Sequence, residues 1–313
     1  MFQKALHRIR ASAEVDARFL YYALLDAGGQ DKFSALFTGS TIKHLPKEKL
    51  RLLSVALPAK EMQGRIADCL TAYDDVIDVN RRRMALLERA ARELYQEWFV
   101  RLRFPGYEHT EVSGTIPQGW ERALLGSCAK FLSGGTPSKA RPDFWSGEIP
   151  WVSSGELTGM RIRRTTLCVS DEGADQGSRI VPANTILAVV RGMSLAKDFR
   201  IGLTSRVVTF NQDLKAIVPR DGLPSLFLFH SLDAQRDAIR DQAGEASHGT
   251  KKLDSDVLAS VPVLIPTPAV LDAFVQRVKP VHMQWDTLDR QNQQLLTARN
   301  LLLPRLMRGE LLT

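Results

Sequence analysis

Apolar residues recur at helical spacing through a long stretch that begins directly after Pro58. The stretch holds no proline and a single glycine, so the pattern predicts one helix over residues 59–104 with an apolar face in nearly heptad order. Such a helix would be about 65–70 Å long and needs a partner of similar length to cover that face. A shift between Val76 and Met84 indicates a stutter. The face consists of Met62, Ile66, Cys69, Tyr73, Val76, Asn80, Met84, Leu87, Ala91, Leu94 and Trp98.

A second segment of the same kind lies within residues 267–313, from Leu271 to about Met307. Pro280 and Pro304 interrupt it, and each would bend a helix or mark its frayed end. The two segments have similar lengths and each carries one asparagine on its apolar face, where a buried asparagine fixes register. We therefore predict that they pair as a coiled coil; the alternative is two amphipathic helices, each packed on its own domain. The second face consists of Leu271, Phe274, Val278, Val281, Trp285, Leu288, Asn292, Leu295 and Leu302.

The chain contains an internal repeat at an offset of 208 residues, which places residues 1–105 over 209–313. Identities are few, but the apolar positions and prolines stay in register. Residues 106–208 have no earlier copy. The sequence thus predicts a duplicated unit of globe plus helix, in which the first globe lacks its front half. The clearest matches are Phe19–Tyr21 with Phe227–Phe229 and Leu50–Pro58 with Leu258–Pro266.

Between the long segments, many short strand patterns accompany one main helix over residues 224–243, which indicates an α+β fold. The expected strands include Lys130–Leu132, Thr185–Arg191, Ile201–Thr204, Val207–Phe210, Ala216–Pro219 and Val261–Ile265. The predicted domains are the C-terminal part of a first globe (1–58), the first long helix (59–104), a complete globe (105–266) and the second long helix (267–313).

Composition narrows the class of protein. The formal net charge is +7 and the pI about 9.4, which mildly favours a polyanionic partner. Cys69, Cys128 and Cys168 have neither metal-type spacing nor an even number, so a reducing compartment fits. No apolar run is long enough to cross a membrane and the N-terminus has no signal-peptide layout, so we expect a soluble, cytoplasmic protein without a membrane partner.

The globe combines cations with hydrogen-bonding side chains on turn-rich segments, as a reader of DNA needs for phosphates and base edges. Arg161–Arg164 and Lys251-Lys252 stand out because like charges cluster there without acidic neighbours. For any one residue the ordinary alternative is a solvated surface charge. The candidate DNA-binding residues are Lys139, Arg141, Ser153, Ser154, Arg161, Arg163, Arg164, Arg191, Lys197, Arg206, Asn211, Gln212, His248, Lys251 and Lys252.

No catalytic constellation is found. Residues 244–251 approach a phosphate-binding loop, but the order is Thr-Lys and no apolar strand precedes it. Pro142-Asp143 and Glu148 lack the lysine of a nuclease core, no base-methylation motif exists, and the six histidines have no metal spacing. The sequence predicts that the chain is not an enzyme and binds neither metal nor cofactor directly.

Several of these segments resemble a target recognition domain, the DNA-reading globe of specificity subunits of type I restriction–modification systems. The resemblance covers essentially the whole chain and rests on Gly134–Lys139, Ile149–Ser154, Ile186–Gly192, Asn211-Gln212 and Gly249–Leu253. It implies a mixed α/β recognition domain plus two long antiparallel helices that form a coiled coil. A full-length member would have a complete first globe, so we expect an N-terminally truncated first recognition domain here.

The resemblance implies a DNA sequence-recognition subunit that binds a half-site of double-stranded DNA and holds methyltransferase and restriction subunits. S-adenosylmethionine, Mg²⁺ and ATP would then belong to those partners. One alternative is a truncated specificity subunit with a regulatory or assembly role and no independent reading. Another is an autonomous DNA enzyme. We expect the incomplete first globe to be completed by a complementing fragment or by a second copy, and a homodimer would read a palindromic site.

Overall fold

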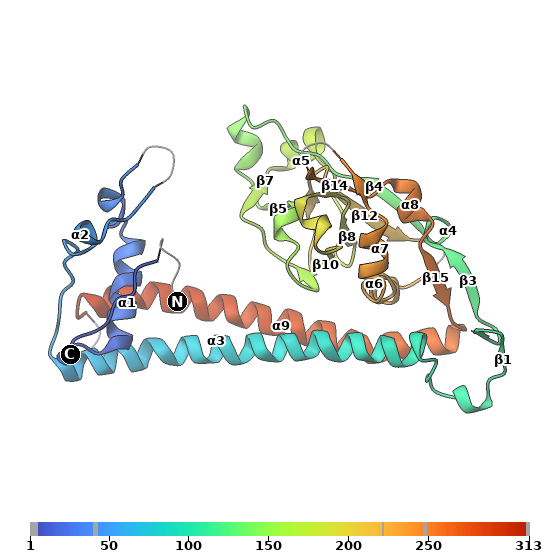
Figure 1. Ribbon diagram of the computed structural model, residues 1–313, viewed down its shortest axis with the longest axis horizontal. Helices are drawn as coiled ribbons and strands as arrows, with labels where there is room; N and C mark the ends of the chain where they lie inside the picture. Colours follow the sequence, from blue (N-terminus) through green and yellow to red (C-terminus); the bar gives the residue numbers. More distant parts are fainter. Residues whose placement is uncertain (1–5, 40–42, 221, 247–248, 311–313) are drawn as a thin grey trace. The chain divides into compact units, whose positions relative to one another are not determined.

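The chain divides into two compact units, each built on one part of the same two long helices (Figure 1). Unit 1 comprises residues 1–84 and 287–313, and unit 2 comprises residues 85–286. Helices and mixed sheets occur together, which confirms the predicted α+β class. The computed structural model describes residues 6–39, 43–220, 222–246 and 249–310.

Unit 1 is a small helical cluster packed on its part of the long helices. The side chain of Asp16 caps α1 by accepting hydrogen bonds from the backbone N–H groups of Arg18 and Phe19, at 2.8 and 3.2 Å. Phe19 is buried in a core that joins α1 to both long helices. The helices are α1 (Ala17–Gly29), η1 (Ser34–Leu36), α2 (Lys47–Leu50), the first part of α3 (Lys60–Tyr95) and the last part of α9 (Pro268–Met307). The other core residues are Tyr22, Ala23, Ile66, Ala67, Leu70, Leu303 and Leu306.

Unit 2 contains the complete globe, built around a five-stranded sheet in the order β4-β12-β8-β10-β6. Strand β12 is antiparallel to β4 and to the central strand β8, β10 is antiparallel to β8, and β6 is parallel to β10. Strand β8 has four successive buried residues, as expected for a strand covered on both faces. The bounds are β4 Ala129–Ser133, β6 Arg161–Ile162, β8 Ile186–Val189, β10 Ile201–Thr204 and β12 Leu214–Pro219.

Smaller sheets and short helices surround this sheet. The sheets are β1-β2, β11-β5-β7, β13-β14-β9 and β15-β3. Their strands are β1 Val112–Ser113, β2 Ile116–Pro117, β3 Glu121–Leu124, β5 Ile149–Val152, β7 Leu167–Val169, β9 Arg191–Gly192, β11 Thr209–Phe210, β13 Gly244–Glu245, β14 Lys251–Lys252 and β15 Pro262–Ile265. The helices are α4 Leu125–Cys128, α5 Asp171–Gly177, α6 Ser225–Asp233, α7 Arg236–Asp241 and α8 Ser255–Ala259, with short turns η3 Tyr107–His109, η4 Pro142–Trp145, η5 Ser154–Glu156 and η6 Met193–Ala196.

The apolar face of α3 differs from the predicted one near its middle. Ile77 is buried with 2% exposure, whereas Val76 is 47% exposed. With Ile77 in the seam, Leu70, Ile77 and Met84 follow one another at seven residues, and the predicted stutter is wrong. Val76 and Ile77 are adjacent and both strongly apolar, so hydrophobicity alone does not tell which of them is buried. Contact with α9 decides it. The other seam residues proposed from the sequence are buried or half-buried: Ile66, Tyr73, Leu87, Trp98, Phe274, Trp285 and Leu295.

The two helices are antiparallel partners in each unit. In unit 1 the amide of Asn80 donates a hydrogen bond to the side-chain oxygen of Asn292 at 3.0 Å, and both side chains are buried. In unit 2 the indole of Trp285 donates to Glu88 at 2.9 Å. A paired asparagine on the seam satisfies both amides and opposes a shift in register.

The helix ends also differ from the predicted ones. Helix α3 stops at Tyr95, a π-helical turn η2 (Gln96–Val100) follows, and Leu102 is left-handed with φ 57°. Phe104 is buried beside Trp120, with ring centroids 4.7 Å apart. Helix α9 runs from Pro268 to Met307 and continues through Pro280 and past Pro304.

The repeat predicted from the sequence has a structural counterpart. The first residues of three helix pairs differ by the same 208-residue offset: α1 and α6, α2 and α8, and α3 and α9. The difference lies in the strands. Residues 6–11 correspond to β12 and residues 54–57 to β15, yet neither segment forms a strand in unit 1. Strands β12 and β15 pair with β4, β8 and β3, and these come from residues 106–208, the part without an earlier copy.

Candidate nucleic-acid interface

One end of the five-stranded sheet collects polar and basic groups from every strand. The register places the end of β4, the end of β8, the start of β12, the start of β10 and the residues before β6 side by side. Residues 211–213 precede β12 and Arg191 follows β8, and the backbone N–H of Val190 donates to the carbonyl of Asp213 at 2.9 Å. Groups that are far apart in sequence therefore share this end.

Three cations define what we call the basic ribbon: Arg191, Lys251 and Lys252. Strand β9 pairs with β14 so that Arg191 lies opposite Lys252. Among the described residues, the guanidinium of Arg191 has no hydrogen-bond or ion-pair partner. The two lysines form ion pairs with Glu245 and Asp254 at 3.8 and 2.5 Å. Exposed ion pairs of this kind are weak, so both lysines can exchange their carboxylates for phosphates.

Polar side chains lie beside the basic ribbon. Strands β5 and β11 are parallel, and the N–H of Asn211 donates to the carbonyl of Val152 at 2.9 Å, which places Ser153 near Asn211. Ser153 and Ser154 are half-buried, and Gln212 is exposed and accepts a hydrogen bond from the hydroxyl of Thr136 at 2.7 Å. This end of the sheet thus offers hydroxyl and amide groups, which can bind base edges.

Gly134 makes the turn after β4 possible. A Cβ atom at this position would lie 2.2 Å from the carbonyl oxygen of Phe210 and 2.6 Å from that of Asn211. The close approach holds the Gly134-Gly135 turn directly on the segment that carries Gln212. Any side chain at position 134 would therefore displace Gln212.

Arg161 does not belong to a DNA-binding surface. Its side chain is 5% exposed, and its Nε lies 2.8 Å from a carboxylate oxygen of Asp286 and donates to the hydroxyl of Ser205 at 3.0 Å. Burial lowers the pKa of Arg161, and the carboxylate of Asp286 opposes that shift. The prediction from the sequence is corrected because the guanidinium forms a buried ion pair between β6 and α9.

Asn211 is also structural. The side chain is 6% exposed, and its carbonyl oxygen accepts a hydrogen bond from the backbone N–H of Asp213 at 3.2 Å. It stabilises the turn that presents Gln212, so it acts on the site through its neighbour.

The remaining predicted residues lie on the surface of unit 2, outside the basic ribbon. Arg141 is held by Asp143 and stacks over the ring of Phe144, with its guanidinium carbon 4.3 Å from the ring centroid. Lys139, Arg164, Lys197 and Arg206 are exposed and Arg163 is half-buried. His248 lies outside the described residues.

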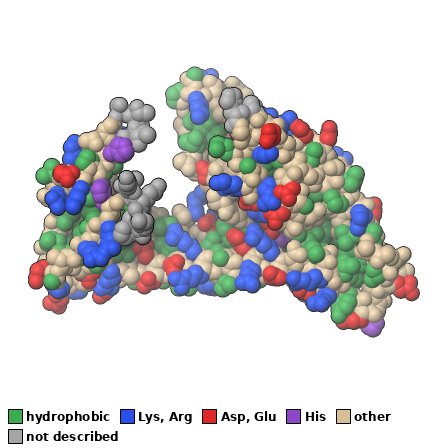
Figure 2. Space-filling view, in the orientation of Figure 1, with side chains coloured by type: hydrophobic (Ala, Val, Ile, Leu, Met, Phe, Trp, Pro, Cys, Tyr) green, Lys and Arg blue, Asp and Glu red, His purple; other side chains and the backbone are tan. Residues whose placement is uncertain are grey.

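Two cations near the Gly134 turn were missed in the sequence. The guanidinium of Arg179 donates to the carbonyl of Ser133 at 3.1 Å, and the ammonium of Lys215 donates to the hydroxyl of Ser133 at 2.7 Å. Alternation along β12 could have indicated Lys215, because its neighbours Leu214 and Ala216 are both buried. On the face drawn in Figure 2, Lys and Arg side chains are interspersed with Asp and Glu.

A buried polar pair lies behind the sheet, between α6 and α9. The Nε2 atoms of His230 and His282 are 3.0 Å apart, and the exposed fractions of the two residues are 1% and 2%. Burial lowers the pKa of both histidines, so near pH 7 both are neutral and one ring can donate to the other. In the described part of the chain no group of His, Cys, Asp or Glu could hold a metal ion. None of the described helices combines the length and apolar character that crossing a bilayer requires.

Comparisons with known proteins agree with this arrangement. A family described as "Type I restriction modification DNA specificity domain" matches residues 1–89. The HindI specificity subunit of Haemophilus influenzae is 23% identical over 359 residues, covering 94% of this chain and 77% of that protein. The EcoR124I/EcoR124II specificity subunit of Escherichia coli is 30% identical over 170 residues, covering 54% of this chain and 41% of that protein.

A solved structure shows the same fold. The S subunit of a type I restriction–modification system from M. genitalium has a TM-score of 0.54 at 18% identity, covering 94% of this chain and 73% of that one. Two long helices that carry a mixed-sheet globe are the architecture that this chain shares with that subunit. The matches to the family model and to the curated relatives support a specificity subunit of a type I restriction–modification system. These subunits recognise DNA and do not catalyse, which confirms the prediction that the chain is not an enzyme.

Proposed function

We propose that the globe of unit 2 reads one DNA half-site with the end of its five-stranded sheet. The observation that carries this proposal is the convergence of Arg191, Lys251 and Lys252 with Gln212 and Ser153 at that end. Cations position a protein on the phosphates, while amide and hydroxyl groups distinguish base edges. The two kinds of group lie next to each other here on a rigid sheet, as a reader requires.

Partner subunits are part of the proposal. Type I specificity subunits work in assemblies, and we infer that this chain holds methyltransferase subunits and, where present, restriction subunits. S-adenosylmethionine, Mg²⁺ and ATP would be bound by those partners. The chain would then supply the sequence choice and the partners the chemistry.

Two equivalent grooves suit two copies of one partner. Each lies between the end of a long helix and the docked helix of the same unit, with a volume of about 300 Å³ in unit 1 and about 400 Å³ in unit 2. Their residues correspond at the 208-residue offset, so similar surfaces of two methyltransferase subunits would fit both. In unit 1 they include Ala23, Ala27, Ala56, Pro304 and Met307, and in unit 2 Ser231, Gln235, Leu264, Gln96 and Phe99.

Charge reversal of the basic ribbon tests DNA reading. The chain is co-expressed with its methyltransferase subunits, the methylated sites are mapped in genomic DNA, and the mapped duplex is used for binding. In the assembled complex we expect Arg191→Glu to weaken binding by about tenfold or more and to lower the slope of affinity against salt by about one ion per lost phosphate contact.

The matched control is Arg220→Glu. Arg220 is exposed and follows β12 at the opposite end of the sheet, so its reversal changes the net charge equally but should leave binding within about twofold. Equal losses in both variants would remove the basic ribbon from the interface. If the complex assembles stably but methylates no particular DNA sequence, the chain has a regulatory or assembly role and does not read DNA.

A further inference from the structure

The side-chain amide of Gln212 is held in one orientation at the end of the sheet that carries the basic ribbon. The hydroxyl of Thr136 donates a hydrogen bond to its carbonyl oxygen at 2.7 Å. Gln212 is exposed, and among the described residues its amide nitrogen has no hydrogen-bond partner. Because the carbonyl oxygen is directed at Thr136, the two N–H groups are what Gln212 offers to a ligand.

The turn that carries Gln212 is fixed on both sides. The side-chain oxygen of Asn211 accepts a hydrogen bond from the backbone N–H of Asp213 at 3.2 Å, which closes an Asx turn around Gln212. The backbone N–H of Asn211 donates to the carbonyl of Val152 at 2.9 Å. Gln212 therefore extends from a rigid element, as a side chain that distinguishes base edges requires.

The backbone of Thr136 is fixed as well. The backbone N–H of Gly135 donates to the carbonyl of Phe210 at 2.9 Å, and Pro137 is buried. A Cβ atom on Gly177 would lie 2.4 Å from the Cα of Pro137, so this loop packs tightly on the globe. A residue that precedes proline is also restricted in its backbone conformation. The hydroxyl of Thr136 therefore sets the orientation of the amide that it binds.

An amide of fixed orientation distinguishes the two purines. In the major groove guanine presents two acceptors, N7 and O6, whereas adenine presents the acceptor N7 beside the donor N6–H₂. A glutamine binds adenine with an N–H group and its carbonyl oxygen together, but in Gln212 that oxygen is engaged by Thr136. Against adenine the amide N–H₂ would meet N6–H₂, and two buried donors without an acceptor are unfavourable.

We propose that Gln212 reads guanine in the major groove and that Thr136 is the positioning residue that excludes adenine. This inference rests on the proposed reading of DNA by this end of the sheet, and it adds the base that is read. The backbone N–H of Val190 donates to the carbonyl of Asp213 at 2.9 Å, so the segment of Gln212 lies beside that of Arg191. A phosphate contact by Arg191 would hold the duplex against the amide.

Binding to base-substituted duplexes tests the inference in the complex with methyltransferase subunits. The mapped methylation sites give the duplex, and Gln212→Ala identifies the contacted position as the one at which base preference is lost. We expect guanine there, bound at least about tenfold more tightly than adenine. Inosine, which keeps N7 and O6, should bind within about twofold of guanine, whereas 7-deazaguanine, which lacks the N7 acceptor, should bind at least about fivefold more weakly.

Two substitutions of Thr136 separate its hydroxyl from its shape. Thr136→Val keeps the shape without the hydroxyl, so the amide of Gln212 can turn, and the preference for guanine over adenine should fall to about twofold or less. Thr136→Ser keeps the hydroxyl and should keep the preference. Gln212→Lys offers donors only and should also keep it.

Several results would overturn the inference: an unchanged preference in Thr136→Val, a contacted base other than guanine, equal binding of guanine and 7-deazaguanine, or no change of base preference in Gln212→Ala. Failure of DNA reading has a different signature, namely equal losses in Arg191→Glu and Arg220→Glu. If Arg191→Glu alone weakens binding while Thr136→Val leaves the preference unchanged, the role of Thr136 is rejected and DNA reading is retained.

Discussion

In each unit a short helix docks on the two long helices, and the two units differ in the side chains that pack at this contact. Phe19 of α1 and Phe227 of α6 are buried at equivalent positions against the long helices. The core around Phe19 is mainly aliphatic, with Tyr22 as its one other aromatic residue, whereas Phe227 lies among aromatic rings, with the centroid of Phe99 at 5.2 Å and that of Phe274 at 6.2 Å. The repeat therefore preserves where a helix docks and how much apolar surface it buries, while the side chains that do so have changed.

Polar contacts have changed more than apolar ones. In unit 1 the hydroxyl of Tyr22 donates to Asp74 at 2.7 Å. The equivalent residues of unit 2 are His230 and His282, whose rings meet at 3.0 Å. Both pairs satisfy buried hydrogen-bonding groups between the docked helix and a long helix. Such a polar pair can be replaced when both of its residues change together. Because one pair contains two histidines and the other a tyrosine and an aspartate, the two units differ in how their stability depends on pH.

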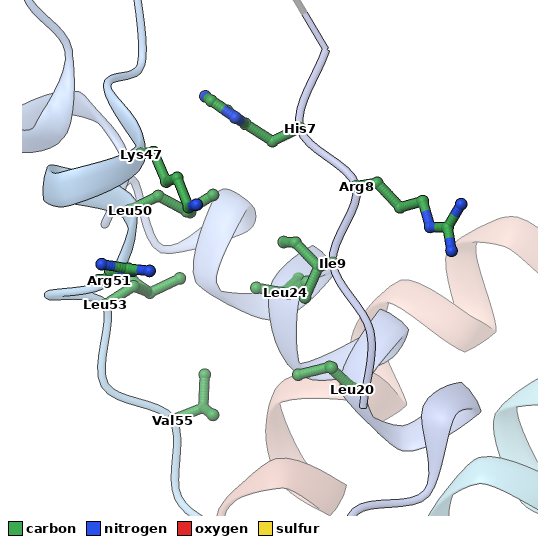
Figure 3. Close-up of a pocket in the computed structure, with 10 residues that line it drawn as sticks. All are labelled: His7, Arg8, Ile9, Leu20, Leu24, Lys47, Leu50, Arg51, Leu53 and Val55. Carbon is green, nitrogen blue, oxygen red and sulfur yellow. The ribbon is translucent and has the colours of Figure 1, made fainter. Parts of the chain in front are cut away.

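Truncation of equivalent leucines should distinguish a covered surface in unit 2 from an open groove in unit 1. Leu232 is fully buried, and we expect Leu232→Ala to destabilise unit 2 by about 2–5 kcal/mol through lost burial and a cavity. Leu24 lines an apolar groove of about 350 Å³ in unit 1 (Figure 3), so Leu24→Ala should cost about 1 kcal/mol or less. Amide exchange in each unit measures both effects. Equal losses would mean that this groove is covered in solution.

Removal of the half-buried carboxylate of Asp286 should have an effect of similar size. Asp286→Ala leaves the guanidinium of Arg161 buried without its ion-pair partner, and we expect a loss of about 3–5 kcal/mol in unit 2. The double variant Arg161→Met with Asp286→Ala should recover most of that stability, because no uncompensated charge remains. Urea denaturation measures both variants. A small loss in the single variant would show that solvent reaches Arg161.

Acid should weaken unit 2 through its histidine pair. Burial lowers the folded-state pKa of His230 to about 4, below the 6.5 of the unfolded chain. The stabilisation is complete above pH 6.5 and is lost as pH falls toward 4, with a limiting slope of about 1.4 kcal/mol per pH unit for each histidine. Amide exchange of α6 between pH 7 and pH 5 measures it, and His282→Gln should reduce the slope. Burial raises the pKa of Tyr22 to about 12, so Tyr22 gains no charge in this range.

The helix pair and the repeat could be predicted because burial leaves a period in the sequence. Apolar positions at three and four residues identify a helix, and a hundred residues in register identify a duplication. The choice between Val76 and Ile77 could not be made, since both carry the same signal and only the facing helix distinguishes them. The second helix continues through Pro280 as the predicted range required: Pro280 is exposed, so the carbonyl that loses its hydrogen bond can be hydrated.

The candidate site was less predictable than the fold. Arg161 looked like a surface charge because its partner Asp286 is 125 residues further along the chain. The basic ribbon combines residues of β9 and β14, two strands of two residues each, and no local pattern announces such short strands. Sequence reasoning selected basic residues near Lys251, but only the sheet shows which of them lie together. The role of the basic ribbon in DNA binding stays a prediction.

The constant 208-residue offset has a genetic consequence. The first residues of α3 and α9 are separated by this offset, and so are the seam pairs Ile77/Trp285 and Met84/Asn292. A crossover between the two copies at equivalent codons would therefore preserve both the reading frame and the heptad phase. The resulting chimaeras would gain or lose a whole globe with its helix and keep intact junctions. The architecture of this chain is therefore compatible with the exchange of whole units at matching positions of the long helices.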